Sequence, residues 1–263
     1  MSEKTQSNRR LGTDYGDYVF IRSLSIRSPA PGHVSLAMED VAHSFHMDFT
    51  HDGSKVTSIK AAWSREPLSS CTGSPQALEA LVGCPLSDNI FSIGRNIDSR
   101  QLCTHMYDMF CLAATHAYEQ RPEYRSDVVI PDSADGPVLA ALNRNGEKQL
   151  EFEMERQDYQ TIVRPEPCRG MNILKGFLPW VRVNVQADQH EHYFSMQKAL
   201  FIARIQLFNL ESTVGKSATL SGPPEGSCYG SQAERYQNAV RIYPPLRWRR
   251  DELGKVLESF EFC

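Results

Sequence analysis

Residues 33–50 read HVSLAMEDVAHSFHMDFT, two β-rich runs in which apolar and polar side chains alternate. Alternation with a period of two is typical of antiparallel strands that bury one face. The preceding DYVFIRSLSIRS (17–28) has the same character, and HDGSKVTSIKAAWSR (51–65) places a hairpin turn at Gly53 before another such run. These neighbouring runs together predict an antiparallel β-meander.

The two faces of this meander differ in chemistry. Because successive side chains of a strand point to opposite faces, Met47 and Phe49 share one face while His46 and Asp48 share the other. We therefore expect an apolar face that packs on the rest of the fold and an opposite face that carries acid–base groups.

Apolar residues at spacings of three and four predict helices farther along the chain. RQLCTHMYDMFCLAATHAYE indicates a helix over 100–119, and DQHEHYFSMQKALFIARIQLFNLE indicates a longer one over 188–211, capped by Asp188. A short helix is expected over 75–82, with Ser74 as its N-cap and Pro75 in its first turn.

Alternating runs return in 124–163, where RNGE supplies a turn between two of them. The predicted fold class is α+β: a curved antiparallel sheet, made of the meander and later strands, packs on the long helices. We expect three parts, namely a disordered N-terminal tail (1–16), an α+β core domain (17–211), and a C-terminal extension of loop and helix (212–263).

Composition excludes several classes of function. A net charge of −4 over 263 residues, with a pI near 6.1, gives no broad positive field, so we expect no nucleic-acid partner. The polar opening MSEKTQSNRR lacks the apolar core of a signal peptide, and no apolar run has the length of a membrane helix. The seven cysteines are scattered without a CxxC pair, which favours free thiols and a cytoplasmic location without membrane contact.

Several catalytic signatures are missing from the sequence. It has no P-loop, no GxGxxG after a strand, no HExxH and no GxSxG. The sequence therefore does not predict nucleotide, dinucleotide, zinc-protease or α/β-hydrolase chemistry, and we expect no cofactor.

The first turns of the 100–119 helix concentrate chemically active side chains. His105 and Asp108 are neighbours at i and i+3, and His46 from the meander could join them. A histidine with an orienting carboxylate is what general acid–base catalysis requires, so we predict His105, Asp108 and His46 as catalytic residues. His116 lies near the helix end, where a histidine has a structural role available, so we expect His105 and not His116 to carry the chemistry.

We expect an apolar pocket between the sheet and the helices, because a Met- and aromatic-lined cavity with few polar groups suits a hydrophobic or aromatic small molecule. Its predicted substrate-binding residues are Cys103, Tyr107, Met109, Trp180, His192 and Tyr193. The leading hypothesis is a cofactor-independent lyase or isomerase that acts on a hydrophobic or aromatic catabolic intermediate by elimination, deformylation or a double-bond shift.

Two other hypotheses remain open at this point. Cys71, Cys103 and His105, with His43 or His46 as a fourth ligand, could bind zinc or iron, since thiolate and imidazole suit these metals. A helix start would also favour the Cys103 thiolate without any metal. Alternatively, the protein is a non-catalytic accessory or ligand-binding subunit, for which the 212–263 extension would supply a surface for a partner subunit or a second copy.

The order of these motifs resembles a known family. The meander, then SPQALEALVG, LCTHMYDMF, and KGFLPWVRV before QKALFIARIQL, resembles a bacterial domain family of unknown function, number 2889 in the DUF series. The resemblance covers roughly 20–211. Cys103, Thr104 and His105 match the Gly-Cys-Thr-His-Leu-type element of that family, although Gln101-Leu102 replace its usual glycine. This resemblance implies no particular reaction.

A weaker resemblance is to iron–sulfur scaffold proteins of the IscU/NifU type. There a Cys-Gly loop and a helix-opening His-Cys pair hold a metal or cluster; Cys71 matches the loop cysteine, and Cys103 with His105 stand near the pair. The pattern departs from that family because the pair here is Cys-x-His and because the strand at 56–64 has no cysteine. The resemblance implies a related fold and supplies the metal-binding hypothesis.

Overall fold

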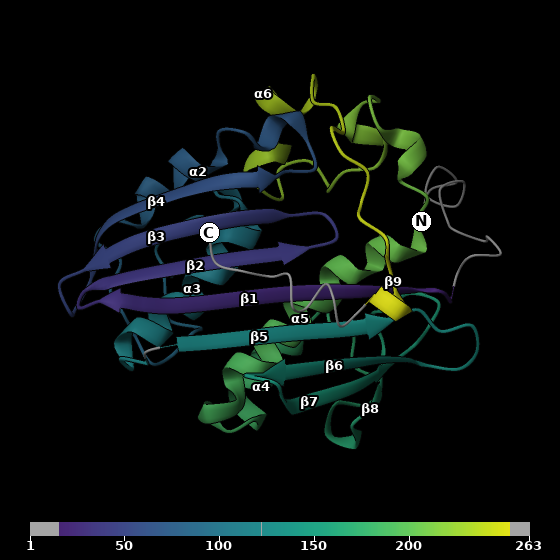
Figure 1. The fold of residues 1–263 in the computed structure, drawn as a ribbon, viewed down its shortest axis with the longest axis horizontal. Helices are drawn as coiled ribbons and strands as arrows, with labels where there is room; N and C mark the ends of the chain where they lie inside the picture. Colours follow the sequence, from purple (N-terminus) through teal and green to yellow (C-terminus); the bar gives the residue numbers. More distant parts are fainter. Residues whose placement is uncertain (1–15, 122, 253–263) are drawn as a thin grey trace. The chain divides into compact units, whose positions relative to one another are not determined.

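The computed structural model describes residues 16–121 and 123–252, which form two compact units. We call residues 24–124 and 210–245 the meander unit, and residues 16–23, 125–209 and 246–252 the hairpin unit. Nearly all of the predicted N-terminal tail and the end of the predicted extension lie outside the described residues. Figure 1 labels the elements of both units.

The predicted meander is confirmed in the meander unit. Its strands are β1 (Tyr18–Ala30), β2 (His33–Asp40), β3 (Ser44–His51) and β4 (Val56–Arg65), and only the part of β1 from Leu24 onward belongs to this unit. Their order in the sheet is β4-β3-β2-β1. In the antiparallel register, Met47 pairs with Leu36 on β2 and with Ala61 on β4. Residues 33–50 are thus two strands joined by a turn at residues 41–43.

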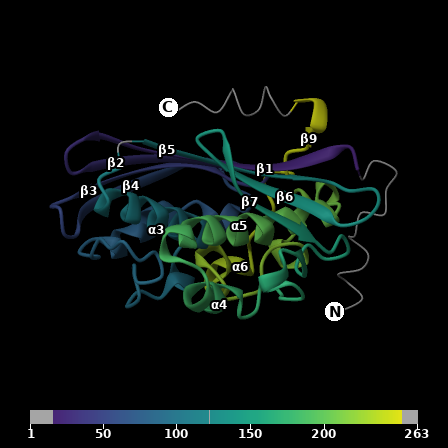
Figure 2. The same cartoon turned by 90° about the horizontal axis from the view of Figure 1, so that it is seen from below.

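Helices cover the apolar face of these strands. They are η1 (Ser69–Cys71), α2 (Ser74–Ala77), η2 (Leu78–Leu81), η3 (Ser99–Gln101) and α3 (Thr104–Tyr118). Figure 2 shows α3 beneath β2, β3 and β4, and the Phe110 ring meets the Phe49 ring edge-on with 5.6 Å between centroids. Phe45 and Met47 are buried on the same face, so the predicted division of the two faces is correct.

Two details of the predicted helices are wrong. Ser74 is not an N-cap: it is the first residue of α2, and its hydroxyl accepts a hydrogen bond from Trp63 Nε1 at 3.2 Å. The predicted 75–82 helix divides into α2 and η2, and α3 begins at Thr104 because Leu102 and Cys103 are extended.

Residues 210–245 complete the core of the meander unit. Their elements are η7 (Glu211–Thr213), η8 (Ala218–Leu220), η9 (Tyr229–Ser231) and α6 (Ala233–Tyr236). Ala218, Tyr236 and Ala239 bury themselves against Leu68, which follows β4. Leu68 also forms a β-bridge with Arg241, so two distant parts of the chain share backbone hydrogen bonds here.

The hairpin unit has a second set of antiparallel strands. They lie in the order β1-β5-β6-β7-β8, and β9 (Trp248–Arg249) pairs with β1. The unit contains the part of β1 up to Ser23 and the part of β5 (Glu123–Pro131) from Arg125 onward. Its other strands are β6 (Val138–Arg144), β7 (Glu147–Met154) and β8 (Ile162–Arg164). Asn145 and Gly146 join β6 to β7 with φ angles of 50° and 84°, which is the turn that RNGE predicted.

The described part of the hairpin unit has six helices, of which α5 packs on β6 and β7 (Figure 2). They are η4 (Glu166–Cys168), α4 (Phe177–Asn184), η5 (Ala187–Gln189), α5 (His190–Ala203), η6 (Arg204–Leu207) and η10 (Arg250–Glu252). Asp188 is not the cap that the sequence predicted, because it lies within η5 and Gln189 occupies the N-cap position of α5 without a side-chain hydrogen bond. The α+β class is confirmed.

The described helices are all too short or too polar to cross a lipid bilayer.

Candidate functional site

A buried carboxylate organises the turn between β2 and β3. Asp40 is fully buried, and its Oδ1 accepts hydrogen bonds from the backbone N–H groups of Ala42 and His43, both at 2.8 Å. The same oxygen lies 3.1 Å from Nδ1 of His43. A guanidinium nitrogen of Arg65 donates to the Asp40 carbonyl, which ties the turn to the end of β4. The turn therefore holds the His43 ring in one orientation.

His43 in turn contacts the head of α3. Its ring stacks on the ring of His105, with 3.9 Å between centroids and 29° between planes. His105 lies in the first turn of α3, and its Nδ1 is 3.9 Å from the Cys103 sulfur. We call His43 and His105 the histidine pair. The structure thus aligns a carboxylate, two imidazoles and a thiol from two elements.

This arrangement has definite proton chemistry. A carboxylate beside Nδ1 favours the tautomer that carries its proton there, and that tautomer leaves Nε2 of His43 as an acceptor. Two imidazoles in contact do not both hold a positive charge at low cost, because like charges disfavour each other. One ring of the histidine pair is therefore suited to accept a proton and the other to donate one.

Cys103 differs from its sequence-based expectation. It occupies the N-cap position of α3, as expected, but it is buried. Burial raises the pKa of the Cys103 thiol far above its usual range, and the charge of Cys71 raises it further, whereas backbone N–H groups of Met106 and His105 lower it. Burial outweighs the helix dipole, so the expected stabilised thiolate is wrong and the group is a neutral thiol at pH 7.

The proposed metal ligands do not make a preformed metal site. Among residues 16–121 and 123–252, no three His, Cys, Asp or Glu side chains are arranged to hold a metal ion. Cys71 lies at the end of η1, and its backbone carbonyl accepts a hydrogen bond from Trp63 Nε1 at 3.1 Å.

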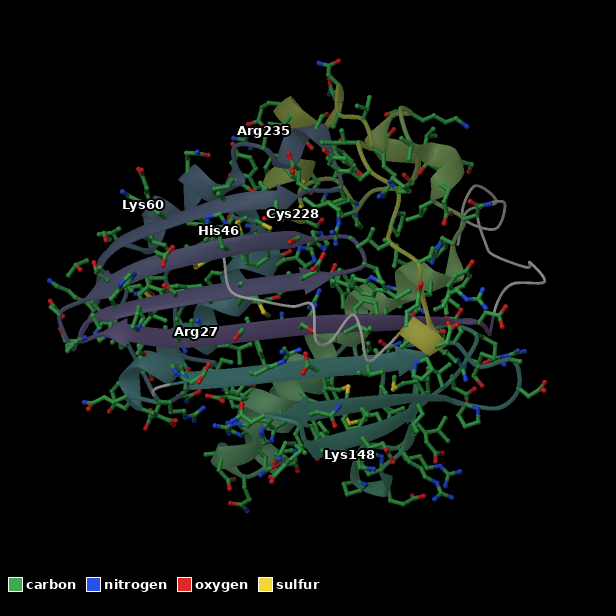
Figure 3. The ribbon with its side chains drawn as sticks, viewed as in Figure 1. Arg27, His46, Lys60, Lys148, Cys228 and Arg235 are labelled. Atoms are coloured by element: carbon green, nitrogen blue, oxygen red, sulfur yellow. The ribbon has the colours of Figure 1, made fainter. Side chains whose placement is uncertain are left out.

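His46 is not brought to the head of α3. It is exposed on β3, between Phe45 and Met47, whose side chains are buried on the α3 face (Figure 3). Strand alternation therefore points His46 to the opposite face. Its neighbour Asp48 bonds on that face to Ser35 and to His33 Nε2, the latter at 3.3 Å.

Tyr107 is half-buried, and the α3 residues that follow it belong to the packed core. Asp108 and Met109 are buried, and Tyr107 donates its hydroxyl to the carbonyl of Ile93 at 3.0 Å. Burial raises the pKa of Tyr107 above its usual range. The ring also packs against Gly94, where a Cβ would lie 2.6 Å from the Tyr107 oxygen. Tyr107 thus anchors the loop before α3.

The remaining predicted site residues belong to the hairpin unit. Trp180 stacks on Phe177 with 6.3 Å between centroids, and Tyr193 meets Phe152 edge-on at 5.7 Å. His192 is buried, and its Nδ1 lies 3.2 Å from the side-chain oxygen of Gln189. These residues make an aromatic cluster on α4 and α5.

His116 is buried near the end of α3. Its ring meets Tyr124 edge-on, with 6.1 Å between centroids. His116 is therefore part of the packed core at this end of the helix.

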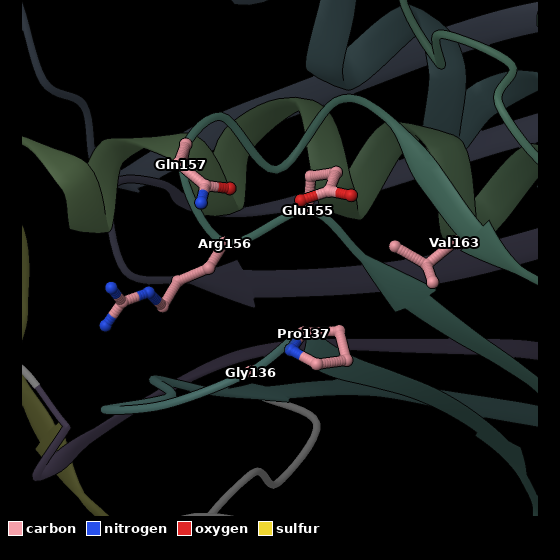
Figure 4. A pocket seen from close by; sticks show the side chains of 6 residues that line it. All are labelled: Gly136, Pro137, Glu155, Arg156, Gln157 and Val163. Carbon is pink, nitrogen blue, oxygen red and sulfur yellow. The ribbon is translucent and has the colours of Figure 1, made fainter.

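A pocket of about 260 Å³ lies in the hairpin unit, between the β5–β6 and β7–β8 loops (Figure 4). Its lining consists of Gly136, Pro137, Glu155, Arg156, Gln157 and Val163. None of these residues is among those that the sequence analysis selected.

Sequence reasoning missed the dyad of Asp40 and His43. His43 entered only as an alternative metal ligand, and Asp40 did not enter at all. The available signal was DVAH (40–43), an Asp-x-x-His at a turn between two alternating runs, where a short acidic side chain closes the turn on its own backbone.

Comparison with known proteins identifies a family for the meander unit. Residues 26–119 match the family described as "Protein of unknown function (DUF2889)". No curated protein matches the chain. The resemblance to iron–sulfur scaffold proteins receives no support from these comparisons. The resemblance to the DUF2889 family is confirmed over residues 26–119, which include the Cys-Thr-His element and match the model of that family.

Proposed function

We propose that this protein is a cofactor-independent small-molecule enzyme of the lyase or isomerase class, and that the histidine pair performs its acid–base chemistry. One observation carries the proposal: a carboxylate-bound His43 stacks on His105 at the head of α3. A carboxylate that orients an imidazole, next to a second imidazole, supplies both a base and an acid.

The roles follow from the hydrogen bonds. Asp40 holds the His43 ring through Nδ1, so Nε2 of His43 removes a proton from a carbon beside a carbonyl group. His105 in its protonated form donates a proton to the departing group or to the far end of the shifting double bond. Elimination and double-bond migration consist of these two transfers. In deformylation the base takes a proton from the water that attacks the formyl carbon, the bond from that carbon to the rest of the substrate breaks, formate leaves, and the acid protonates the carbon left behind. Asp108, which the sequence analysis grouped with them, remains a proposed contributor from the next turn of α3.

The surroundings favour an apolar substrate. The Trp63 ring lies 6.1 Å from the His43 ring and meets Phe45 edge-on at 5.5 Å. Aromatic faces beside an acid–base pair suit a hydrophobic or aromatic intermediate. We also retain a cytoplasmic location in the proposal, because the six described cysteines are all free.

Proton abstraction can be tested before the full reaction is known. The parent protein is incubated in D₂O with a panel of aromatic and alicyclic ketones, aldehydes and β-keto acids, and deuterium uptake at carbon is followed by NMR. We expect at least one compound to exchange faster than in buffer, and His43→Gln to return the rate to that of buffer. A panel with no accelerated exchange, or an unchanged rate in His43→Gln, contradicts the proposal.

A further inference from the structure

Three thiols from three separate segments meet near the head of α3. Cys71 ends η1, Cys103 is the N-cap of α3, and Cys228 is the N-cap of η9. The backbone N–H of Tyr229 donates to the carbonyl of Leu102 at 2.9 Å, so the peptide units that precede Cys103 and follow Cys228 are hydrogen-bonded to each other. This contact fixes η9 against the start of α3.

Cys71 lies against the same turn. A Cβ built on Gly230 would be only 3.0 Å from the Cys71 sulfur and 3.7 Å from its Cα. Gly230 is two residues after Cys228, so η9 brings the Cys228 backbone close to Cys71 (Figure 3 labels Cys228). The absence of a side chain at Gly230 is what permits this approach.

Cys228 also affects the Cys71 thiol electrostatically. Burial, followed by the charge of Cys228, raises the pKa of Cys71 to about 12. Cys71 is therefore a neutral thiol at pH 7, and thiolates are the reactive form of cysteine. The Cys228 thiol donates a weak hydrogen bond to the Ser231 hydroxyl at 3.5 Å, which a modest rotation of the side chain would break. Both thiols are half-buried, and the weak bond to Ser231 leaves the Cys228 side chain able to rotate toward an oxidant.

We propose that Cys71 and Cys228 are a reversible redox modification site that closes to a disulfide when the protein meets a peroxide. The Cys228 sulfur attacks the peroxide, the O–O bond breaks, and Cys228 becomes a sulfenic acid with release of water or an alcohol. The Cys71 sulfur then attacks the Cys228 sulfur, the S–O bond breaks, and the hydroxide leaves with the Cys71 proton as water. The two thiols are oxidised by two electrons, which the peroxide accepts.

The disulfide would link the end of η1 to the start of η9. It would therefore join residues 210–245 covalently to the segment that follows β4, beside Cys103 and the histidine pair. A small-molecule thiol restores both cysteines by exchange. This site does not depend on the proposed acid–base activity.

Peptide mapping of the full chain under non-reducing conditions tests the proposal directly. Protein treated with a few equivalents of hydrogen peroxide is alkylated to block remaining thiols, digested and analysed by mass spectrometry. We expect two of the seven thiols to disappear, a single cross-linked peptide pair that contains Cys71 and Cys228, and full recovery after dithiothreitol. Retention of both thiols, or a cross-link that joins Cys103 to either of them, overturns the assignment.

A pair of variants separates the two cysteines. In Cys71→Ser the cross-link should be absent while Cys228 becomes reactive toward dimedone, which traps sulfenic acids. Cys84→Ser, which changes a buried cysteine elsewhere in the meander unit, should form the cross-link as the parent does. A Cys71→Ser protein whose Cys228 does not react with dimedone contradicts the proposed order of steps. The mapping of the parent protein does not depend on the folding of either variant.

Discussion

The His43 ring lies on the His105 ring, 3.9 Å away, although 61 residues of sequence separate them. Oδ1 of Asp40 lies 3.1 Å from Nδ1 of the His43 ring. The two imidazoles are therefore inequivalent. His43 has a fixed orientation and a neighbouring negative charge, whereas His105 has the neutral thiol of Cys103 at 3.9 Å.

His43→Gln should leave a folded protein that has lost about 10²- to 10⁴-fold in rate, which is the usual loss on removing a positioned general base. His105→Gln should lose a similar factor, because the proposed acid is then missing. The measurement is deuterium exchange into the best compound of the panel, with circular dichroism to verify the fold. Activity within threefold of the parent in either variant would exclude the histidine pair from the chemistry.

The matched control for these variants is His46→Gln. His46 is exposed on the opposite face of the strands, so its loss should change neither the rate nor the stability. A large loss of rate in His46→Gln would restore the catalytic assignment of this residue that the sequence suggested.

Asp40→Asn should separate the effect of the Asp40 charge on the His43 ring from the contribution of the Asp40 side chain to folding. The amide oxygen of asparagine still accepts from the backbone of Ala42 and His43, but it carries no charge to stabilise a protonated His43. We expect a loss of roughly 10-fold or more in rate with a small loss of stability. Asp40→Ala leaves two buried donors unpaired and should cost on the order of 2–6 kcal/mol in urea unfolding, at about 1–3 kcal/mol for each donor. Equal stabilities of the two variants would argue against the turn geometry.

Tyr236→Phe should destabilise the meander unit. The Tyr236 hydroxyl is within hydrogen-bonding distance of the carbonyls of Ala218 and Pro223, at 3.1 and 2.5 Å, and its loss leaves buried acceptors unpaired at a cost of about 1–3 kcal/mol. Burial raises the pKa of Tyr236 from 10.0 to about 12, with smaller contributions from the charges of Cys228 and Cys71.

A pKa that is higher in the folded state gives stability that is fully present below pH 10 and is lost as pH rises through 12. The parent should therefore have a larger free energy of unfolding than Tyr236→Phe below pH 10, and this difference should disappear between pH 10 and 12. Urea unfolding across that range measures it. A difference that stays constant over this range would show that the hydroxyl is not buried as a donor.

Gly94→Ala should destabilise the loop before α3 for two reasons. Gly94 has φ +65°, which costs a residue with a side chain about 1–2 kcal/mol, and the new Cβ would lie 2.6 Å from the Tyr107 oxygen. Overpacking of this kind adds about 1–3 kcal/mol. Gly53→Ala is the matched control, because φ is +91° there and no atom lies within 4 Å. If urea unfolding shows the same loss for both, the Tyr107 contact is not tight.

The sequence predicts those parts of the fold that depend on local periodicity. The alternation along 33–50 predicts two strands and their buried faces, and Asn145-Gly146 predicts the turn of a hairpin. Both predictions are confirmed because each depends only on residues that are neighbours in sequence. Spacings of three and four likewise located α3 and the start of α5 to within a few residues, but α5 ends at Ala203, eight residues before the predicted end at 211. Helix caps were less well predicted, since Ser74 has a tertiary partner in Trp63 that local sequence does not reveal.

The candidate site depends on contacts between distant segments. His105 was selected because it shares a helix with Cys103 and Asp108, but its stacking partner His43 comes from a turn between two strands. His46 was selected because it is polar and close in sequence, yet strand alternation sends it to the other face. The packing of the β2–β3 turn on the head of α3 is what brings His43 to His105, and the sequence does not reveal that contact.

The contribution of residues 210–245 to the meander unit also determines when this unit is finished during synthesis. A ribosome delivers Leu68 and the head of α3 early, but Tyr236 and Ala239, which bury Leu68, emerge only after the whole of 125–209 has been made. Domains whose segments are contiguous can fold as soon as they leave the ribosome. Here the nascent chain leaves Leu68 and Cys71 uncovered until residues 210–245 arrive, so the unit that carries the histidine pair reaches its final form only after residues 125–209 have been made.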